Sequence, residues 1–333
     1  MSDHVMMYRC NFASFVDFAF RELHPGEQMQ DNWHIRLIAN ILQFTWSNSD
    51  SETARRLIFN LPPGYLKTHI CSIAFPAWVL GRDPRKSVLI ISETLDQALE
   101  IRERCAELMS TPRYRKIFPR CRISGARRDL ELSYGGRIRH VGVGYSLPQR
   151  RSDLVVIDNP QSLHNLERID PACFVEIGRT LKDPKRGVVL LTTRRLAEND
   201  LTSFLRALGN WGKLEIPIVA RRETSWVFPP DDNHQRMDGE PLHYWYENWD
   251  QIEGHIREVG GEAFAWQYMQ GAYKPMTTGQ RVHYVDGEPA GLMIGSFNPT
   301  TVTLEDFAKL RQEYEEKYDP LKVNLPGFPL KPI

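Results

Sequence analysis

The sequence is poor in cysteine, and its cysteines follow no ligand pattern. Five are scattered over 333 residues, none of them in a C-x-x-C pair: Cys10, Cys71, Cys105, Cys121 and Cys173. An odd number without paired spacing argues against a disulfide framework and indicates no zinc site. We expect reduced thiols.

An excess of one charge and a long apolar run are also missing. Lysine plus arginine number 42, as do aspartate plus glutamate, so the total charge neither favours nor excludes a nucleic-acid partner. The start, "MSDHVMMYRC", has no basic region followed by an apolar run, and apolar stretches elsewhere are too short to cross a bilayer. The sequence therefore predicts a cytoplasmic protein with no membrane partner. A hydrophobic content of 41% is ordinary for a folded chain.

Short apolar runs alternate with longer amphipathic segments from residue 56 onward. The runs that predict buried strands are "RLIFNL", "SVLIIS", "SDLVVID", "GVVLLTT" and "KLEIPIV". Helices are expected between them at 67–81, 94–110, 166–181 and 199–208. This alternation is typical of an α/β protein with a mostly parallel sheet flanked by helices. Gly135 and Gly136 predict an antiparallel hairpin at one sheet edge.

The segments before and after the predicted sheet do not show this alternation. Residues 11–46 predict a helical segment before the sheet, and further helices are expected at 249–260, 262–270 and 303–317. We divide the chain into an N-terminal helical segment (1–55), an α/β domain (56–225), a linker subdomain (226–275) and a short, irregular C-terminal tail (276–333).

The stretch "FNLPPGYLKT", residues 59–68, is a candidate phosphate-binding loop (Walker A). It lies between a predicted strand and a predicted helix, as such a loop must, and it ends in Lys67 and Thr68. Leu61 and Leu66 occupy the two positions where the usual pattern has glycine. The alternative is a surface loop with a chance Lys-Thr pair.

A second stretch, "SDLVVIDNP" at 152–160, has the form of a Walker B segment, which is an apolar strand ending in a carboxylate. Asp158 would hold Mg²⁺ together with the hydroxyl of Thr68. Both stretches would meet at the carboxyl edge of a parallel sheet, where ligands bind in such folds. Together they favour a nucleotide site over a chance match.

A third stretch, "LTTRRLAENDLTSFLRALGNWGKLEIPIVA" at 191–220, resembles the ATPase domain of the large terminase subunit of tailed bacteriophages when taken with the other two. Segments "FPAWVLGRDP", "YRKIFP" and "AFAWQYMQ" are also similar to terminase sequence, and the resemblance covers about 11–275. It implies a P-loop NTPase that uses ATP and Mg²⁺ to move double-stranded DNA into a capsid in the host cytoplasm. Its implied partners are the portal protein, the small terminase subunit and further copies of the chain in a ring.

The resemblance also implies residue roles. The expected nucleotide-binding residues are Pro63, Gly64, Tyr65, Leu66, Lys67 and Thr68, and the expected metal ligands are Thr68 and Asp158. Catalytic positions fall on Asp158, Asn159, Thr193 and Arg194, with Thr192 to Arg194 matching the family's coupling segment.

Four more residues have two open interpretations each. Trp33 and His34 lie where terminases place adenine contacts, or they simply pack on a helix. Arg150 and Arg151 would reach phosphate, or they are solvated loop residues.

Two departures from the family pattern matter. Asn159 replaces the second carboxylate expected after Asp158, and an amide can orient a water but cannot accept its proton. Glu167, Glu176 and Glu198 are candidate substitutes.

The second departure is that residues 276–333 are too few for the nuclease domain with which large terminases usually continue. Asp286 and Glu288 look like loop acids, so we expect a separate nuclease subunit. The alternative function is a catalytically weakened, terminase-like nucleotide-binding or assembly protein from a prophage remnant. A helicase-like ATPase is disfavoured by the Trp211-x-x-Leu214-x-x-Pro217 stretch.

Overall fold

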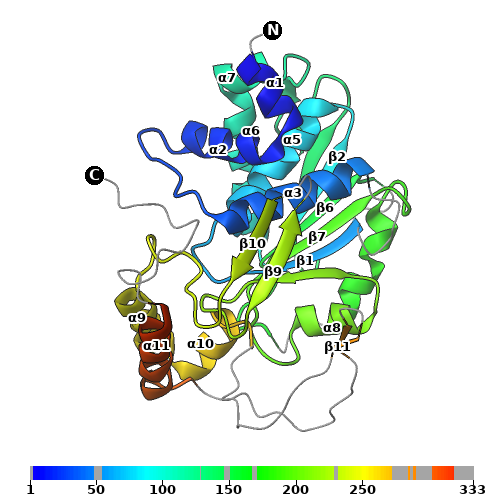
Figure 1. The fold of residues 1–333 in the computed structure, drawn as a ribbon. Helices are drawn as coiled ribbons and strands as arrows, with labels where there is room; N and C mark the ends of the chain where they lie inside the picture. Colours follow the sequence, from blue (N-terminus) through cyan, green and yellow to red (C-terminus); the bar gives the residue numbers. More distant parts are fainter. Residues whose placement is uncertain are drawn as a thin grey trace.

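The computed structural model describes most of the chain. The described residues are 3–48, 55–127, 129–145, 151–166, 171–228, 232–271, 284–285, 288–289 and 302–318. The expected mostly parallel sheet with flanking helices is confirmed (Figure 1).

Eight strands form the main sheet in the order β3-β4-β5-β2-β6-β7-β1-β8. Their bounds are β1 Arg56–Asn60, β2 Ser87–Ser92, β3 Ile123–Gly125, β4 Leu130–Leu132, β5 Arg137–Gly142, β6 Leu154–Asp158, β7 Val188–Thr193 and β8 Gly212–Glu215. From β5 to β8 all neighbours are parallel, whereas β3, β4 and β5 pair antiparallel. The hairpin expected at Gly135 and Gly136 therefore joins β4 to β5 near one edge, as predicted.

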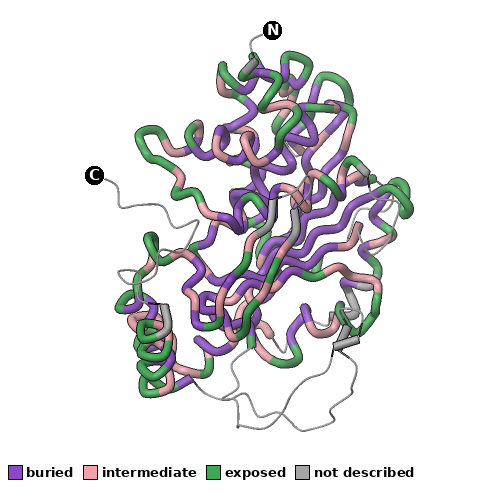
Figure 2. The backbone as a smooth tube through the Cα atoms, in the orientation of Figure 1, coloured by how far each residue is buried: buried purple, intermediate pink, exposed green. Residues whose placement is uncertain are grey.

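Alternate residues of the central strands enter two cores, one on each face of the sheet. Leu57, Val88 and Val156 belong to the larger core, while Ile58, Leu89 and Val155 belong to the smaller one. Because both faces are covered, every residue of β2, β6 and β7 is buried (Figure 2). This double burial explains why the strands are continuous apolar runs in the sequence.

Helices cover both faces. The larger core is shared with α2 (Phe12–Leu23), α3 (Trp33–Asn48), η1 (Thr68–Ala74), α5 (Phe75–Arg82), α6 (Leu95–Ser110) and α7 (Pro112–Ile117). α1 (Asp3–Cys10) packs beside α2 and α7. On the opposite face lie η2 (Pro171–Thr180) and α8 (Leu201–Ala207). No helix in the described part of the chain combines the length and apolar composition needed to cross a membrane.

Two of the expected helices differ in type from an ordinary α-helix. The helix after the candidate phosphate loop begins as a π-helix, η1, and continues as α5. The segment predicted as a helix over 166–181 is a 3₁₀ helix, η2, and residues 167–170 lie outside the described residues. Gly178 and the β-branched Ile177 and Thr180 lower the α-helical propensity of η2.

After β8 the chain forms a small hairpin and a helical cluster. The hairpin strands are β9 (Thr224–Phe228) and β10 (Asp232–Arg236), and the helices are α9 (Trp249–Val259), α10 (Gly261–Gln267) and α11 (Leu304–Tyr318). Two further strands, β11 (Tyr284–Val285) and β12 (Glu288–Pro289), pair with each other. α11 falls in the expected tail, yet Phe307 packs against Trp249 and Phe264, so α9, α10 and α11 form one cluster (Figure 1).

Candidate nucleotide-binding site

The loop between β1 and η1 has an unusual backbone. Gly64 has a φ of 85° and Leu66 a φ of 56°, so both lie in the left-handed region. Lys67, which follows, is right-handed at φ −49° and ψ −56°. A left-handed residue beside a right-handed one is the arrangement that turns successive N–H groups toward an anion. Leu66 therefore keeps the conformation for which glycine is usual in such loops.

This conformation makes Leu66 a strained position, and we predict the effect of relieving it. A left-handed residue with a side chain costs about 1–2 kcal/mol, which the packing of Leu66 on the core offsets. Leu66→Gly should leave stability nearly unchanged, whereas the β-branched Leu66→Ile should lower the free energy of unfolding by roughly 1–2 kcal/mol. Denaturant unfolding of both variants measures this difference. Equal stability of the two would argue against a left-handed residue 66.

Lys67 lies at the end of the loop, with its side chain buried. Its Nζ donates to the carbonyl oxygens of Leu61, at 2.9 Å, and Pro62, at 2.6 Å. These bonds use two of its three N–H donors, which leaves one for an anion. Burial lowers the pKa of Lys67 to about 8, and the charge of Asp158 opposes that shift. The ammonium is therefore mostly protonated at neutral pH.

Asp158 ends β6 and is held by three donors. Ladder pairing aligns it with Ser92 of β2 on one side and Thr192 of β7 on the other. Thr68 Oγ1 donates to its Oδ1 at 3.1 Å, Asn159 Nδ2 donates to the same oxygen at 2.8 Å, and Ser72 Oγ donates to Oδ2.

The environment of Asp158 suits a hard cation. Burial raises the pKa of its carboxyl, and the three donors oppose that rise. A hydroxyl and a carboxylate in contact are oxygen ligands of the kind that Mg²⁺ binds. The donor set of Thr68 and Asp158 therefore fits the metal that the sequence implies.

A cavity of about 510 Å³ opens over the loop, and we call it the phosphate cavity. Its described lining is Pro63, Gly64, Tyr65, Leu66, Lys67, Thr68, His69, Glu93, Gln97, Asn159, Gln161, Ser162 and Arg194. All six expected nucleotide-binding residues thus share one cavity with Asn159 and Arg194. Asp158 lies next to it, in contact with Thr68. The roles of these residues stay predictions.

A neighbouring cavity of about 450 Å³ shares Gly64, Tyr65 and Leu66 with the phosphate cavity. His34 lines it, and burial lowers the pKa of this histidine to about 3, so the ring is neutral. Asn32 Nδ2 lies 3.0 Å from its Nδ1, and the backbone of Tyr65 also contacts the ring. A neutral imidazole in a cavity beside the loop fits the base or sugar of a nucleotide.

Other predicted residues lie elsewhere. Trp33 does not line either cavity and stacks against His234, with ring centroids 4.2 Å apart, and against Trp226, at 4.7 Å. Thr193 is buried, and its hydroxyl donates to the Arg194 carbonyl at 3.1 Å. Arg151 is exposed, and its backbone N–H bonds the carbonyl of Thr180.

Some predictions cannot be placed. Arg150, Glu167 and Asp286 lie outside the described residues, as does the side chain of Glu288. Within the described ranges, no group of three or more His, Cys, Asp and Glu side chains could hold a metal ion.

Sequence reasoning missed several polar residues of the site, Ser72 and Glu93 among them. Ser72 follows Thr68 by four residues, and that spacing would have placed both hydroxyls on one side of a helix. Glu93 directly follows the buried strand β2, as Asn159 follows β6, and an acid in that position was a detectable signal.

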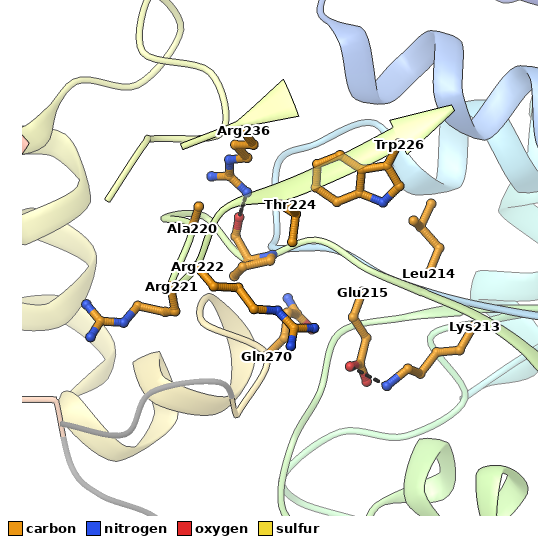
Figure 3. Close-up of a pocket in the computed structure, with 11 residues that line it drawn as sticks. Lys213, Leu214, Glu215, Ala220, Arg221, Arg222, Thr224, Trp226, Arg236 and Gln270 are labelled. Atoms are coloured by element: carbon orange, nitrogen blue, oxygen red, sulfur yellow. Dashed lines mark hydrogen bonds and ion pairs between the residues drawn. The ribbon is translucent and has the colours of Figure 1, made fainter. Parts of the chain in front are cut away.

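A third cavity, of about 510 Å³, lies beside the edge strand β8 (Figure 3). Lys213, Arg222 and Trp226 are among its lining residues, together with the fully buried Arg236. Arg236 donates to the carbonyls of Pro217, Ile218 and Glu240 at 2.7–2.8 Å. This arginine joins β10 to the chain after β8. The cavity contains none of the residues that the sequence predicted for a site.

No protein-family model matches the chain, and no curated protein matches it. The chain is similar to the solved large terminase of bacteriophage HK97, at 10% identity and a TM-score of 0.42, over 62% of this chain and 44% of that one. It is also similar to the large terminase ATPase domain of Thermus phage P74-26, at 15% identity and a TM-score of 0.43, over 75% of this chain and 96% of that domain.

A third similar structure is a large terminase from a thermophilic bacteriophage in complex with ADP. It has 7% identity and a TM-score of 0.43, over 69% of this chain and 51% of that one. The chain thus spans less than half of the HK97 protein. Similarity this distant carries no information on function.

Proposed function

We propose that this chain binds ATP with Mg²⁺ and hydrolyses it as the motor of viral DNA packaging, moving double-stranded DNA into a capsid. The observation that carries the nucleotide part is the phosphate cavity, where the buried Lys67 ammonium and the Thr68–Asp158 pair meet at the carboxyl edge of the sheet. The motor part rests on the resemblance of residues 191–220 to the ATPase domain of the large terminase subunit, with Thr192 to Arg194 matching its coupling segment.

Each part of the site has a chemical task in this proposal. Lys67 and the loop amides would bind the phosphates, and His34 would contact the nucleoside in the neighbouring cavity. Thr68 and Asp158 would hold Mg²⁺, which supplies neutralisation of phosphate charge when bound. Arg194 lines the phosphate cavity and directly follows β7. It would therefore sense the terminal phosphate and couple the loss of that phosphate to DNA movement.

The proposed partners follow from the same resemblance. They are double-stranded DNA, a portal protein, a small terminase subunit, a separate nuclease subunit and copies of this chain in a ring. The alternative, a weakened nucleotide-binding or assembly protein, is favoured by one observation. Asn159 donates its amide to Asp158 and offers no carboxylate at the position expected for the base.

Phosphate release by the purified chain tests the proposal. We expect Mg²⁺-dependent ATP hydrolysis that increases when linear double-stranded DNA is added and that a chelator abolishes. Single-stranded DNA of the same length is the control, and it should stimulate less. ATP binding without any hydrolysis, with or without DNA, would favour the alternative, and the absence of ATP binding would reject the motor and leave only an assembly role.

A further inference from the structure

The place of the expected base is occupied by an amide that already has another partner. Asn159 has a φ of 42°, a left-handed conformation that asparagine tolerates better than most residues. Its Nδ2 donates to Asp158 Oδ1 at 2.8 Å. Because an amide cannot take a proton from water, Asn159 serves to orient Asp158, and the reaction needs a carboxylate from elsewhere.

Strand order brings one candidate next to this position. β2 pairs with β6 in parallel, with Ser92 opposite Asp158, so Glu93 and Asn159 leave the same edge of the sheet side by side. Glu93 lines the phosphate cavity with Lys67 and Thr68. Among the described residues that line this cavity, it is the only carboxylate.

Glu93 is held in place by the loop that follows β6. Ser162 Oγ donates to its Oε1 at 2.6 Å, and Asn165 Nδ2 donates to the same oxygen at 2.7 Å. Asn165 Oδ1 in turn accepts the backbone N–H of Ser162 at 2.8 Å. Within the described chain neither bond to Glu93 uses Oε2, so one carboxylate oxygen fixes the side chain and the other is left for a ligand.

The backbone on the other side of Glu93 is also fixed. Thr94 caps α6 by accepting the N–H of Gln97, whose side chain accepts the N–H of Thr94 in return. Contacts on both sides therefore fix the position of Glu93 at the end of a rigid strand, as a catalytic residue requires.

Of the three acids that the sequence suggested as the base, Glu167 lies outside the described residues, and the other two do not reach the phosphate cavity. Glu176 is exposed and pairs with Arg179 on η2, which covers the opposite face of the sheet from η1. Glu198 is exposed, and neither glutamate lines the phosphate cavity.

The geometry points to Glu93 as the general base of ATP hydrolysis in this chain, an inference that rests on the proposed function. The Glu93 carboxylate takes one proton from a water molecule while the water oxygen forms a bond to the terminal phosphorus. The bond between that phosphorus and the bridging oxygen breaks, and the bridging oxygen keeps the electron pair. The products are ADP and phosphate, and the proton on Glu93 returns to solvent.

Glu93→Gln tests this assignment, because glutamine keeps the size of the side chain and an oxygen for Ser162 and Asn165. We expect ATP affinity within about threefold of the wild type and hydrolysis slower by about 10²–10⁴-fold. A second readout reports a single turnover through the nucleotide that stays bound. Radiolabelled nucleotide recovered from the protein after rapid gel filtration should be ATP in Glu93→Gln and mainly ADP in the wild type.

Three variants accompany this one. Glu176→Gln is the matched control and should behave as the wild type in both assays. Asn159→Ala should retain hydrolysis more fully than Glu93→Gln, since it removes no base. If Glu93→Gln does not fold, Glu93→Asp keeps the carboxylate but withdraws it by one methylene, and its hydrolysis should fall between those of the wild type and of a chain without a base.

The outcomes separate this inference from the proposed function. Wild-type hydrolysis in Glu93→Gln, or in Glu93→Asp where only that variant folds, overturns the base assignment and leaves the proposed function intact. A wild-type chain that binds ATP but never hydrolyses it also overturns the assignment. A wild-type chain that fails to bind ATP overturns both.

Discussion

Replacing Lys67 by alanine is expected to weaken ATP binding by roughly 10–10²-fold, because the one hydrogen bond that its ammonium has left for an anion contributes about 1.5–3 kcal/mol. The ammonium is fixed before any ligand binds, since it donates hydrogen bonds to the carbonyls of Leu61 and Pro62. Little side-chain entropy is then lost on binding. Titration with a fluorescent ATP analogue in the presence of Mg²⁺ measures the affinity.

The fold should survive this substitution. Burial already lowers the pKa of Lys67 to about 8, which means that the surroundings disfavour its charge when no anion is bound. Thermal unfolding without nucleotide should therefore change little in Lys67→Ala. The control is Lys86→Ala, since Lys86 pairs with Asp153 at 3.3 Å near the opposite end of β2. Superimposable titrations of Lys67→Ala and wild type would reject the phosphate-loop interpretation.

The central strands could be predicted from the sequence because both of their faces are buried. β2 and β7 appear as the uninterrupted runs "SVLIIS" and "GVVLLTT", and each lies within one residue of its expected bounds. The position of the phosphate loop was predictable for a similar local reason, since it depends only on a strand, a turn and a helix in succession.

The strand order was not predictable in this way. β2 and β6 are separated by about sixty residues and three intervening strands, and their pairing depends on packing across the whole sheet. That pairing is what brings Glu93 beside Asn159. Residue preferences alone also would not predict the left-handed backbone of Leu66 or the π-helix η1, because they disfavour both.

Asp158 is the second residue whose loss should have a large effect. Its carboxylate accepts hydrogen bonds from Thr68, Ser72 and Asn159, so it is oriented without a metal, although burial raises its pKa. We infer that these three hydrogen bonds hold the buried carboxylate in the orientation that a cation needs. Replacing Asp158 by alanine should eliminate the Mg²⁺ dependence of ATP binding. It should also slow hydrolysis by about 10³-fold or more, since metal stabilisation of phosphate charge is worth several kcal/mol.

Asp158→Ala is best compared with Asp153→Ala, because Asp158 is the last residue of β6 and Asp153 directly precedes the strand. Asp153 precedes β6 at its other end, where it pairs with Lys86 and Lys182, so its loss should lower stability without affecting the response to Mg²⁺. The measurement is ATP affinity and phosphate release over a series of Mg²⁺ concentrations. If Asp158→Ala kept a wild-type Mg²⁺ dependence, the metal would have to be held by other residues, and the pairing of Thr68 with Asp158 would be structural only. A loss confined to Asp158→Ala would place the cation at the carboxyl edge of β6, beside the phosphate cavity.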